Sequence, residues 1–154
     1  MIYREANTND IPELHEIRLS VKENVLVTKS YVTNDHYVRY LTTEGKGWVC
    51  EHEGKILGFA IIDNLKNNVW ALFMRPEYER QGIGRKLHEL MLNWHFTLGR
   101  HKLLLGTSPG SRAETIYKIA GWKLFGTEAG GDLTYEMTYE AWQENFKGEL
   151  AELS

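Results

Sequence analysis

Two glycines and two arginines fall within the six residues Arg80–Arg85, directly before an apolar repeat at helical spacing. The first backbone amides of a helix have no acceptor inside it, and they lie at the positive end of its dipole. Such an end binds phosphate when no side chain holds the oxygens away from the main chain. Gly82 and Gly84 meet that condition, and Arg80 and Arg85 add positive charge. The segment predicts a phosphate-binding loop, and a plain turn before a helix is the alternative.

Two other phosphate motifs are excluded by the spacing of this loop. It lacks the Gly-Lys-Ser/Thr ending of a P-loop and the third glycine of a dinucleotide fingerprint. The strands expected before it are joined by short turns, which indicates antiparallel pairing instead of a parallel βαβ unit.

The elements that must position the loop alternate between strands and helices in a mixed order. Period-two and helical apolar repeats, with cap residues and glycines at their ends, define these elements. Strands are expected at residues 2–6, 48–52, 56–63, 69–74, 103–107, 122–125 and 133–139. Four helices are expected. The first has the apolar positions Ile11, Leu14, Ile17 and Val21, and a shorter one after Thr33 has Tyr37, Val38 and Leu41. The helix after the loop has Ile83, Leu87, Leu90, Met91 and Trp94 and ends at Gly99, and another helix spans residues 111–120 before Gly121.

With its flanks, the segment Val69–Leu87 resembles the signature of the GNAT superfamily of acyl-CoA N-acyltransferases, Gln/Arg-x-x-Gly-x-Gly/Ala after a strand and a proline. The run from Ala113 through Tyr117 to Gly121 and Trp122 is similar to a second motif of that family. The resemblance extends over residues 2–139. It implies an α+β fold with a central mixed, mostly antiparallel sheet flanked by helices. It also implies one N-acetyltransferase domain over residues 1–154, with its core at about 2–139 and a tail at about 140–154.

The resemblance also implies a role for each matching residue. The main chain of Leu72, Phe73 and Met74 would pair with the pantetheine arm of acetyl-CoA. Tyr117 would be the general acid that protonates the departing thiolate, and a phenol, with a pKa of about 10, carries a proton at neutral pH. The alternative for Tyr117 is an aromatic ring packed on the inner face of its helix. The loop residues that would wrap the pyrophosphate are Arg80, Gln81, Gly82, Ile83, Gly84 and Arg85.

The implied reaction is direct transfer of an acetyl group from acetyl-CoA to a primary amine, without a covalent enzyme species. The acceptor would be a small-molecule amine, or a protein N-terminus or lysine. In this family it is bound by the first two helices and nearby strands, here about residues 20–45 together with the loop 127–132. Acidic and aromatic side chains there would suit a cationic amine. They are Tyr31, Tyr37, Tyr40, Asp35, Glu44, Glu128 and Asp132.

Three departures from the family pattern leave a second hypothesis open. Glu79 stands where Gln or Arg is usual, and we expect it to point outward or to pair with Arg80 or Arg85. Gly110 stands where many members have an Asn that contacts the pantetheine arm. The usual acidic general base is absent, which leaves as candidates by location Glu51, Asp63, His36 and Glu136. A CoA-binding sensor or interaction module that has lost catalysis is therefore the alternative.

Composition narrows the class of protein further. The 154 residues carry a net charge of -3 with both signs interspersed, which does not indicate a nucleic-acid surface. The single cysteine, Cys50, lies in an apolar run and is interpreted as a buried thiol in a reducing compartment, with a nucleophile as the alternative. No signal peptide and no membrane-length apolar run are evident. We expect a cytoplasmic protein.

The remaining candidates concern metals and partners. The six histidines, His88 and His95 among them, do not pair at metal-ligand spacing, so no metal site is predicted. Trp70 is expected either in the core or in the acceptor site. The tail places Trp142, Phe146 and Leu150 four residues apart, which predicts a short helix that packs on the surface or forms a homodimer.

Overall fold

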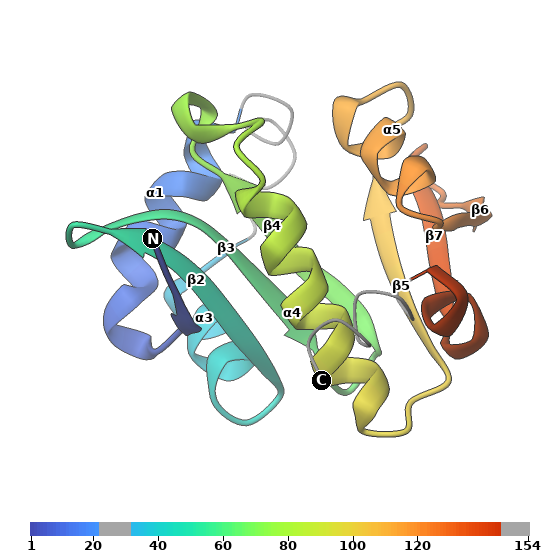
Figure 1. Ribbon diagram of the computed structural model, residues 1–154, viewed down its shortest axis with the longest axis horizontal. Coiled ribbons are helices and arrows are strands. Elements are labelled where there is room, and N and C mark those ends of the chain that lie inside the picture. The colour runs from blue at the N-terminus through green and yellow to red at the C-terminus, as the bar shows by residue number, and fades with distance from the viewer. Residues whose placement is uncertain (22–31, 146–154) are drawn as a thin grey trace. The chain divides into compact units, whose positions relative to one another are not determined.

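The computed structural model describes residues 1–21 and 32–145 (Figure 1). The chain divides into two compact units, Met1–Met91 (unit 1) and Leu92–Ser154 (unit 2). Phe146 and Leu150 of the predicted tail helix, and Tyr31 of the predicted acceptor region, lie outside the described residues.

Unit 1 is built on an antiparallel meander. Its strands are β1 (Ile2–Glu5), β2 (Gly45–His52), β3 (Lys55–Asp63) and β4 (Asn68–Met74), and each pairs antiparallel with the next. Glu53 and Gly54 join β2 to β3 with φ of 52° and 80°, the left-handed pair that a tight hairpin requires. The Asp63 carboxylate accepts from the amides of Leu65 and Lys66, each at 3.0 Å, and so closes the next turn. The predicted meander is confirmed, with β2 beginning three residues earlier than expected.

Helices α1 (Ile11–Ser20) and α3 (Asn34–Leu41) supply apolar residues that pack on one face of this sheet. Helix α1 follows the short 3₁₀ turn η1 (Thr8–Asp10), and helix α3 begins at a capping box formed by Thr33 and His36. The shared core contains Ile11, Leu14, Ile17, Tyr37, Tyr40, Val49, Phe59, Ile61 and Ala71. Cys50 is fully buried in β2, and burial raises the pKa of its thiol, as expected for a structural cysteine and not for a nucleophile.

Helix α4 (Ile83–Thr97) begins in unit 1 and ends in unit 2, where Gly99, with φ of 86°, closes it as predicted. Unit 2 continues with β5 (Lys102–Thr107), α5 (Arg112–Ile119), β6 (Lys123–Thr127) and β7 (Leu133–Thr138). Strand β7 lies between β5 and β6 and pairs antiparallel with both. His95 is buried, and its Nε2 lies 2.8 Å from the Lys102 carbonyl oxygen; the ring is part of the core, as its place on α4 predicts.

The end of β7 corrects one expectation. Tyr139 was expected on the strand, but residues 139–145 are helical, because the Thr138 hydroxyl accepts from the Ala141 amide at 3.1 Å and starts a new turn. In this segment Trp142 is buried, stacks on Phe96 at 5.4 Å and donates to Asn93 Oδ1 at 3.3 Å. The described part of the tail helix therefore packs on its own unit. None of the helices within residues 1–21 and 32–145 is long and apolar enough to cross a bilayer.

Candidate functional site

The predicted phosphate loop follows a short 3₁₀ turn, η2 (Pro76–Tyr78), and enters α4 at Ile83. The backbone is left-handed at Arg80, with φ of 67°, and again at Gly82, with φ of 83°. The first backbone hydrogen bond of the helix runs from the Lys86 amide to the Gly82 carbonyl oxygen at 3.1 Å. The amides of Ile83 and Gly84 therefore belong to the first turn, where a helix offers no internal acceptor.

The two glycines of the loop are required for different reasons. At Gly82 a Cβ atom would meet open space, so the positive φ is what favours glycine. At Gly84 a Cβ atom would lie 2.5 Å from Met74 Cε and 3.1 Å from Met74 Sδ, which is too close without a shift of that side chain. Gly84 thus allows the first turn of α4 to approach the end of β4. Only Ile83, at 1% exposure, anchors the loop in the core.

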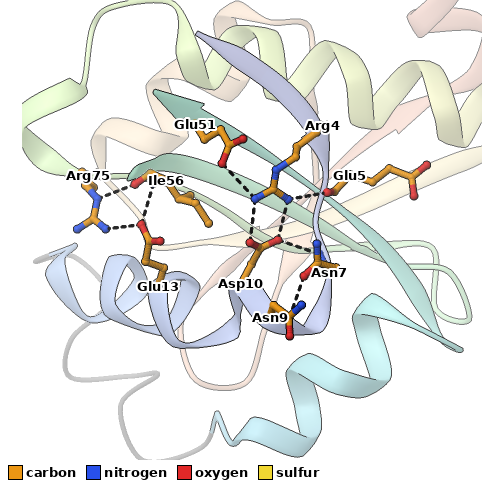
Figure 2. Close-up of polar contacts among 9 residues, drawn as sticks. All are labelled: Arg4, Glu5, Asn7, Asn9, Asp10, Glu13, Glu51, Ile56 and Arg75. Atoms are coloured by element: carbon orange, nitrogen blue, oxygen red, sulfur yellow. Dashed lines mark hydrogen bonds and ion pairs between the residues drawn. The ribbon is translucent and has the colours of Figure 1, made fainter. Parts of the chain in front are cut away.

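Arg75 fixes the start of the loop to helix α1 (Figure 2). Its Nε donates to the Ile56 carbonyl oxygen at 2.7 Å, and its Nη2 and Nη1 donate to Glu13 and Glu16 at 3.2 Å and 2.9 Å. Glu13 also accepts from the Ile56 amide at 2.7 Å. The guanidinium is buried, yet all three of its nitrogens are satisfied, so it is a structural cation that sets where the chain leaves β4.

The two arginines of the loop itself are exposed. Arg85 pairs with Glu89 one turn further along α4, at 3.4 Å, and its side chain is 77% exposed. Arg80 lies on the surface at the left-handed position before Gln81. These charges face water, where each contributes weakly to any one contact but adds to the field around the first turn of the helix.

Strand β4 contains a bulge immediately before the residues predicted to hold the pantetheine arm. Met74, Phe73, Leu72 and Ala71 pair in register with β3, but the register then skips to Val69, which leaves Trp70 as the extra residue. Ala71 and Phe73 share one face by normal alternation, and the bulge brings Trp70 to that same face, toward α1 and α3. The Met74 side chain points from the opposite face of the sheet and lies against Gly84.

Trp70 is the centre of an aromatic cluster that includes two of the predicted acceptor residues. Its ring lies 5.1 Å from that of Tyr37, edge to face, and 4.7 Å from that of Tyr40. Both tyrosines come from α3 and are buried, while Trp70 is half-buried. The Tyr37 hydroxyl lies 3.1 Å from His15 Nδ1 on α1. The structure therefore brings Tyr37, Tyr40 and Trp70 together.

The predicted acidic residues of each unit form contacts of their own. Glu44 accepts from Arg39 Nε at 2.6 Å, and Asp35 is exposed in the first turn of α3. In unit 2, Glu128 accepts from the Thr134 hydroxyl at 2.7 Å, and Asp132 is half-buried in the same loop. Within unit 1, Tyr37 and Tyr40 of the expected acceptor lining thus gather around Trp70, whereas Glu44 pairs with Arg39.

Sequence reasoning missed Arg18, which lies among these rings. Its Cζ lies 4.5 Å from the Trp70 ring centroid and 5.0 Å from that of Phe73, and only 5% of the residue is exposed. A signal was available, because Arg18 lies four residues after Leu14 and seven after Ile11, on the apolar face of α1. A charged residue at such a position indicates a buried cation.

Tyr117 lies on α5 in unit 2, between the N-cap Ser111 and the closing Gly121, whose φ is 100°. Its half-buried ring packs edge to face on Trp122 at 5.8 Å. Burial raises the pKa of Tyr117 above its usual 10, so the phenol keeps its proton at neutral pH. Gly110, where the family Asn was expected, has φ of 74° and donates its amide to Glu114 Oε1 at 2.8 Å.

Three of the four candidate general bases already have structural hydrogen bonds. Glu51 accepts from Arg4 at 3.3 Å, which Figure 2 shows beside the Arg4–Asp10 pair. Asp63 closes the turn after β3, and His36 caps α3. Glu136 is half-buried on β7. No described contact distinguishes one of the four as a base.

Comparison with solved structures shows the fold. The ribosomal-protein-S18-alanine N-acetyltransferase from Escherichia coli matches with a TM-score of 0.72 and 16% identity, over 90% of this chain and 93% of that one. PaiA N-acetyltransferase from Thermoplasma acidophilum, solved in complex with coenzyme A, matches with a TM-score of 0.70 and 16% identity, over 90% and 98%. The smu.2055 protein from Streptococcus mutans matches with a TM-score of 0.75 and 21% identity, over 90% and 99%. The predicted α+β fold, with a mixed, mostly antiparallel sheet flanked by helices, is confirmed.

The sequence itself decides the family. A comparison with curated proteins finds no match. The model of the acetyltransferase (GNAT) family, however, matches residues 11–122, a span that contains α1, the phosphate loop, Tyr117 and Gly121. On that match, the chain belongs to the acetyltransferase (GNAT) family.

Proposed function

We propose that this chain transfers an acetyl group from acetyl-CoA directly to a primary amine. The observation that carries the proposal is the loop Arg80–Arg85. A left-handed backbone at Arg80 and Gly82 leads into first-turn amides at Ile83 and Gly84, in a chain that belongs to the GNAT family. This is the arrangement of main-chain donors and helix dipole that suits a diphosphate.

Residues of unit 1 would hold acetyl-CoA, the acetyl carrier, mainly through their main-chain groups. Arg80, Gln81, Gly82, Ile83, Gly84 and Arg85 bind the pyrophosphate, and the main chain of Leu72, Phe73 and Met74 pairs with the pantetheine arm. The Arg75 hydrogen bonds to Ile56, Glu13 and Glu16 support this assignment, because they fix the strand end and the loop start to one helix. Main-chain donors that are already ordered bind a ligand without the entropy cost of ordering the loop.

Tyr117 supplies the proton that the departing thiolate needs. A phenol whose pKa is raised by burial is fully protonated at neutral pH, so the donor is present in every molecule. General acid catalysis of this kind is worth about 10²- to 10⁴-fold in rate. The amine must attack in its neutral form, so the reaction also requires a group or a water chain that accepts its proton.

The acceptor is a small-molecule amine, or a protein N-terminus or lysine. The similar Escherichia coli enzyme, named for the alanine of ribosomal protein S18, supports a protein N-terminus as one member of this range. The aromatic cluster of Tyr37, Tyr40 and Trp70 supports an acceptor that packs against rings. We place the reaction in the cytoplasm, which the buried free thiol of Cys50 supports.

A second candidate function is a CoA-binding sensor or interaction module without catalysis. It is favoured by the structural hydrogen bonds of Glu51, Asp63 and His36, and by the hydrogen bond that the Gly110 amide donates to the Glu114 carboxylate. Such a protein would keep the loop and the β4 main chain but lack an efficient way to deprotonate the amine.

Two measurements on the full chain separate the candidates. Isothermal titration with acetyl-CoA tests binding, and thiol release across a panel of amino acids, polyamines, aminoglycosides and peptide N-termini tests transfer. Saturable binding with release for at least one amine is the expected result. Binding without release for any amine would favour the module, and the absence of binding would contradict both candidates.

A further inference from the structure

Arg18 is a buried cation without a counterion among the described residues. It is only 5% exposed, and its Nη2 makes one long hydrogen bond, 3.5 Å to the Trp70 carbonyl oxygen. Nε and Nη1 carry three of the five N–H donors of a guanidinium, and neither atom has a hydrogen-bond partner within the described part of the chain. Taking such a group out of water is expensive unless a partner compensates it.

Arg75 shows how the same unit treats a structural arginine. It is 8% exposed, close to the value for Arg18, but it bonds to Glu13, Glu16 and the Ile56 carbonyl oxygen. Arg4 likewise forms a two-pronged pair with Asp10, at 2.9 Å for each nitrogen. Buried Arg75 and half-buried Arg4 are therefore both matched by carboxylates. Arg18 is as deeply buried as Arg75 but has no carboxylate partner among the described residues.

The surroundings of Arg18 leave two of its buried nitrogens without an acceptor among the described residues. The rings of Trp70 and Phe73 lie 4.5 Å and 5.0 Å from the guanidinium carbon and interact with its charge, but they offer no oxygen or nitrogen acceptor to its N–H groups. The Tyr37 hydroxyl, next to His15, is the polar group that interacts with Arg18 from the α3 side. Because Trp70, Phe73 and His15 are only half-buried, the cluster reaches the surface of unit 1.

The position of the cluster connects it with acetyl transfer. Arg18 bonds to the carbonyl of Trp70, the bulge residue, and Phe73 belongs to the main-chain run proposed to hold the pantetheine arm. A ligand group on Arg18 therefore lies beside the strand at which the thioester is expected. A buried single positive charge is matched by a group of single negative charge, and a carboxylate fits the guanidinium better than a neutral carbonyl does.

We propose that Arg18 binds the carboxylate of the acceptor, and that the acceptor is a free amino acid or a similar small molecule carrying both an amine and an acid group. This inference rests on the proposed function. It selects one class from the range of amines above, and it disfavours polyamines, aminoglycosides and protein N-termini, which offer no carboxylate next to the amine. No covalent step involves Arg18, which binds and selects the acceptor.

The first test compares matched acceptors. Thiol release is measured for free α-amino acids and for their amides, in the wild type and in Arg18→Met, whose side chain packs well against rings. The wild type should prefer the acids, and Arg18→Met should raise KM for the acids by roughly 10- to 100-fold while leaving the amides unchanged. Equal use of acids and amides by the wild type would overturn the inference and leave the acetyltransferase function intact.

The second test needs no turnover. The melting temperature is followed with N-acetylglycine, a product-like carboxylate, and with N-acetylglycinamide, which lacks the charge. A saturable rise with the carboxylate alone, lost in Arg18→Met, is expected. The absence of any rise would overturn the inference, even if acetyl-CoA binding also failed and removed the proposed function itself.

The third test separates binding from architecture. Without ligand, Arg18→Met should be at least as resistant to urea as the wild type, since an uncompensated buried charge is removed, whereas Arg75→Met should unfold at lower urea. Equal losses for the two variants would make Arg18 structural and overturn the inference.

Glu23→Gln, at an acid outside the described residues, should leave the urea midpoint of wild type and Arg18→Met equally unaffected. If the effect of Glu23→Gln on the urea midpoint differed between wild type and Arg18→Met, Glu23 would be the counterion of Arg18, and the inference would be overturned.

Discussion

The loop Arg80–Arg85 and the cluster around Arg18 both concentrate positive charge in unit 1, but by opposite means. The loop does so with main-chain amides and a helix end, and its arginines are exposed. The cluster does so with one side chain withdrawn from water among Trp70, Phe73 and Tyr37. The loop holds its shape through backbone conformation, whereas the cluster holds its shape through packing.

This difference has consequences for energy and selectivity. A charge in water interacts weakly with any one partner and is screened by salt, so the loop suits a large, highly charged carrier that many enzymes share. A buried charge interacts strongly but is costly when alone, so the cluster suits discrimination between similar small molecules. Substitutions in the two regions should therefore affect different measured quantities.

The largest effect is expected outside both regions, at Tyr117. Tyr117→Phe should lower kcat by about 10²- to 10⁴-fold, because the thiolate loses its proton donor. Acetyl-CoA affinity, measured by isothermal titration, should stay at the wild-type value. Tyr139→Phe, which removes only the hydroxyl that accepts from Gln143, serves as the control and should keep full turnover. Full activity in Tyr117→Phe would remove the acid assignment.

A smaller effect should distinguish backbone conformation from side-chain chemistry in the loop. Gly82→Val forces a β-branched residue into a backbone with φ of 83° and should weaken acetyl-CoA binding by about 10- to 100-fold. Gly54→Val is a matched control, because Gly54 has φ of 80° and an equally open surrounding in the β2–β3 turn.

Both variants should lose a similar amount of unfolding free energy, about 1–3 kcal/mol, in urea titrations. Only Gly82→Val should lose affinity. If Gly54→Val weakened the binding of acetyl-CoA equally, the loop would not be the site of the diphosphate, and the contrast between loop and cluster would fail.

The smallest effect concerns the response of the cluster to high pH. Burial raises the pKa of Tyr37 above 10, although the nearby Arg18 opposes this shift. A pKa that is higher in the folded state means that the stabilisation is complete below pH 10 and is lost as the pH rises through the folded value. The unfolding free energy should therefore decline above about pH 10, and Tyr37→Phe should make that decline shallower.

Urea titrations at a series of alkaline pH values measure this slope. Gly82→Val changes no titrating group and should keep the wild-type slope, so the pair again separates the two regions. An unchanged slope in Tyr37→Phe would show that the hydroxyl does not titrate with folding.

Local patterns predicted the loop, and they could not predict the cluster. The loop is six consecutive residues whose glycines, arginines and following helix are visible in sequence, and the structure adds that Gly84 is required by its contact with Met74. The cluster joins Arg18 of α1, Tyr37 of α3 and Trp70 of β4, whose proximity depends on tertiary packing. Strict alternation would also have placed Trp70 and Phe73 on opposite faces.

Most elements followed the same division. Hairpin residues such as Glu53 and Gly54, and caps such as Thr33 and Ser111, have local causes and were predictable. The strand expected to reach Tyr139 ends one residue earlier, because the Thr138 hydroxyl starts a helix. The partners of the acids expected to attract an amine also depend on tertiary packing, and the structure shows Glu44 paired with Arg39.

The extra residue in β4 puts the two halves of that strand out of phase. After Trp70, the odd-numbered side chains of β4 face α1 and α3, whereas before it the even-numbered ones do. If Trp70 were removed, Asn68 and Val69 would exchange faces of the sheet, while the residues that follow would keep theirs. In the proposed function, the bulge would therefore separate the ring of Trp70, which faces α1 and α3, from the main-chain ladder of Leu72–Met74 that would hold the pantetheine arm.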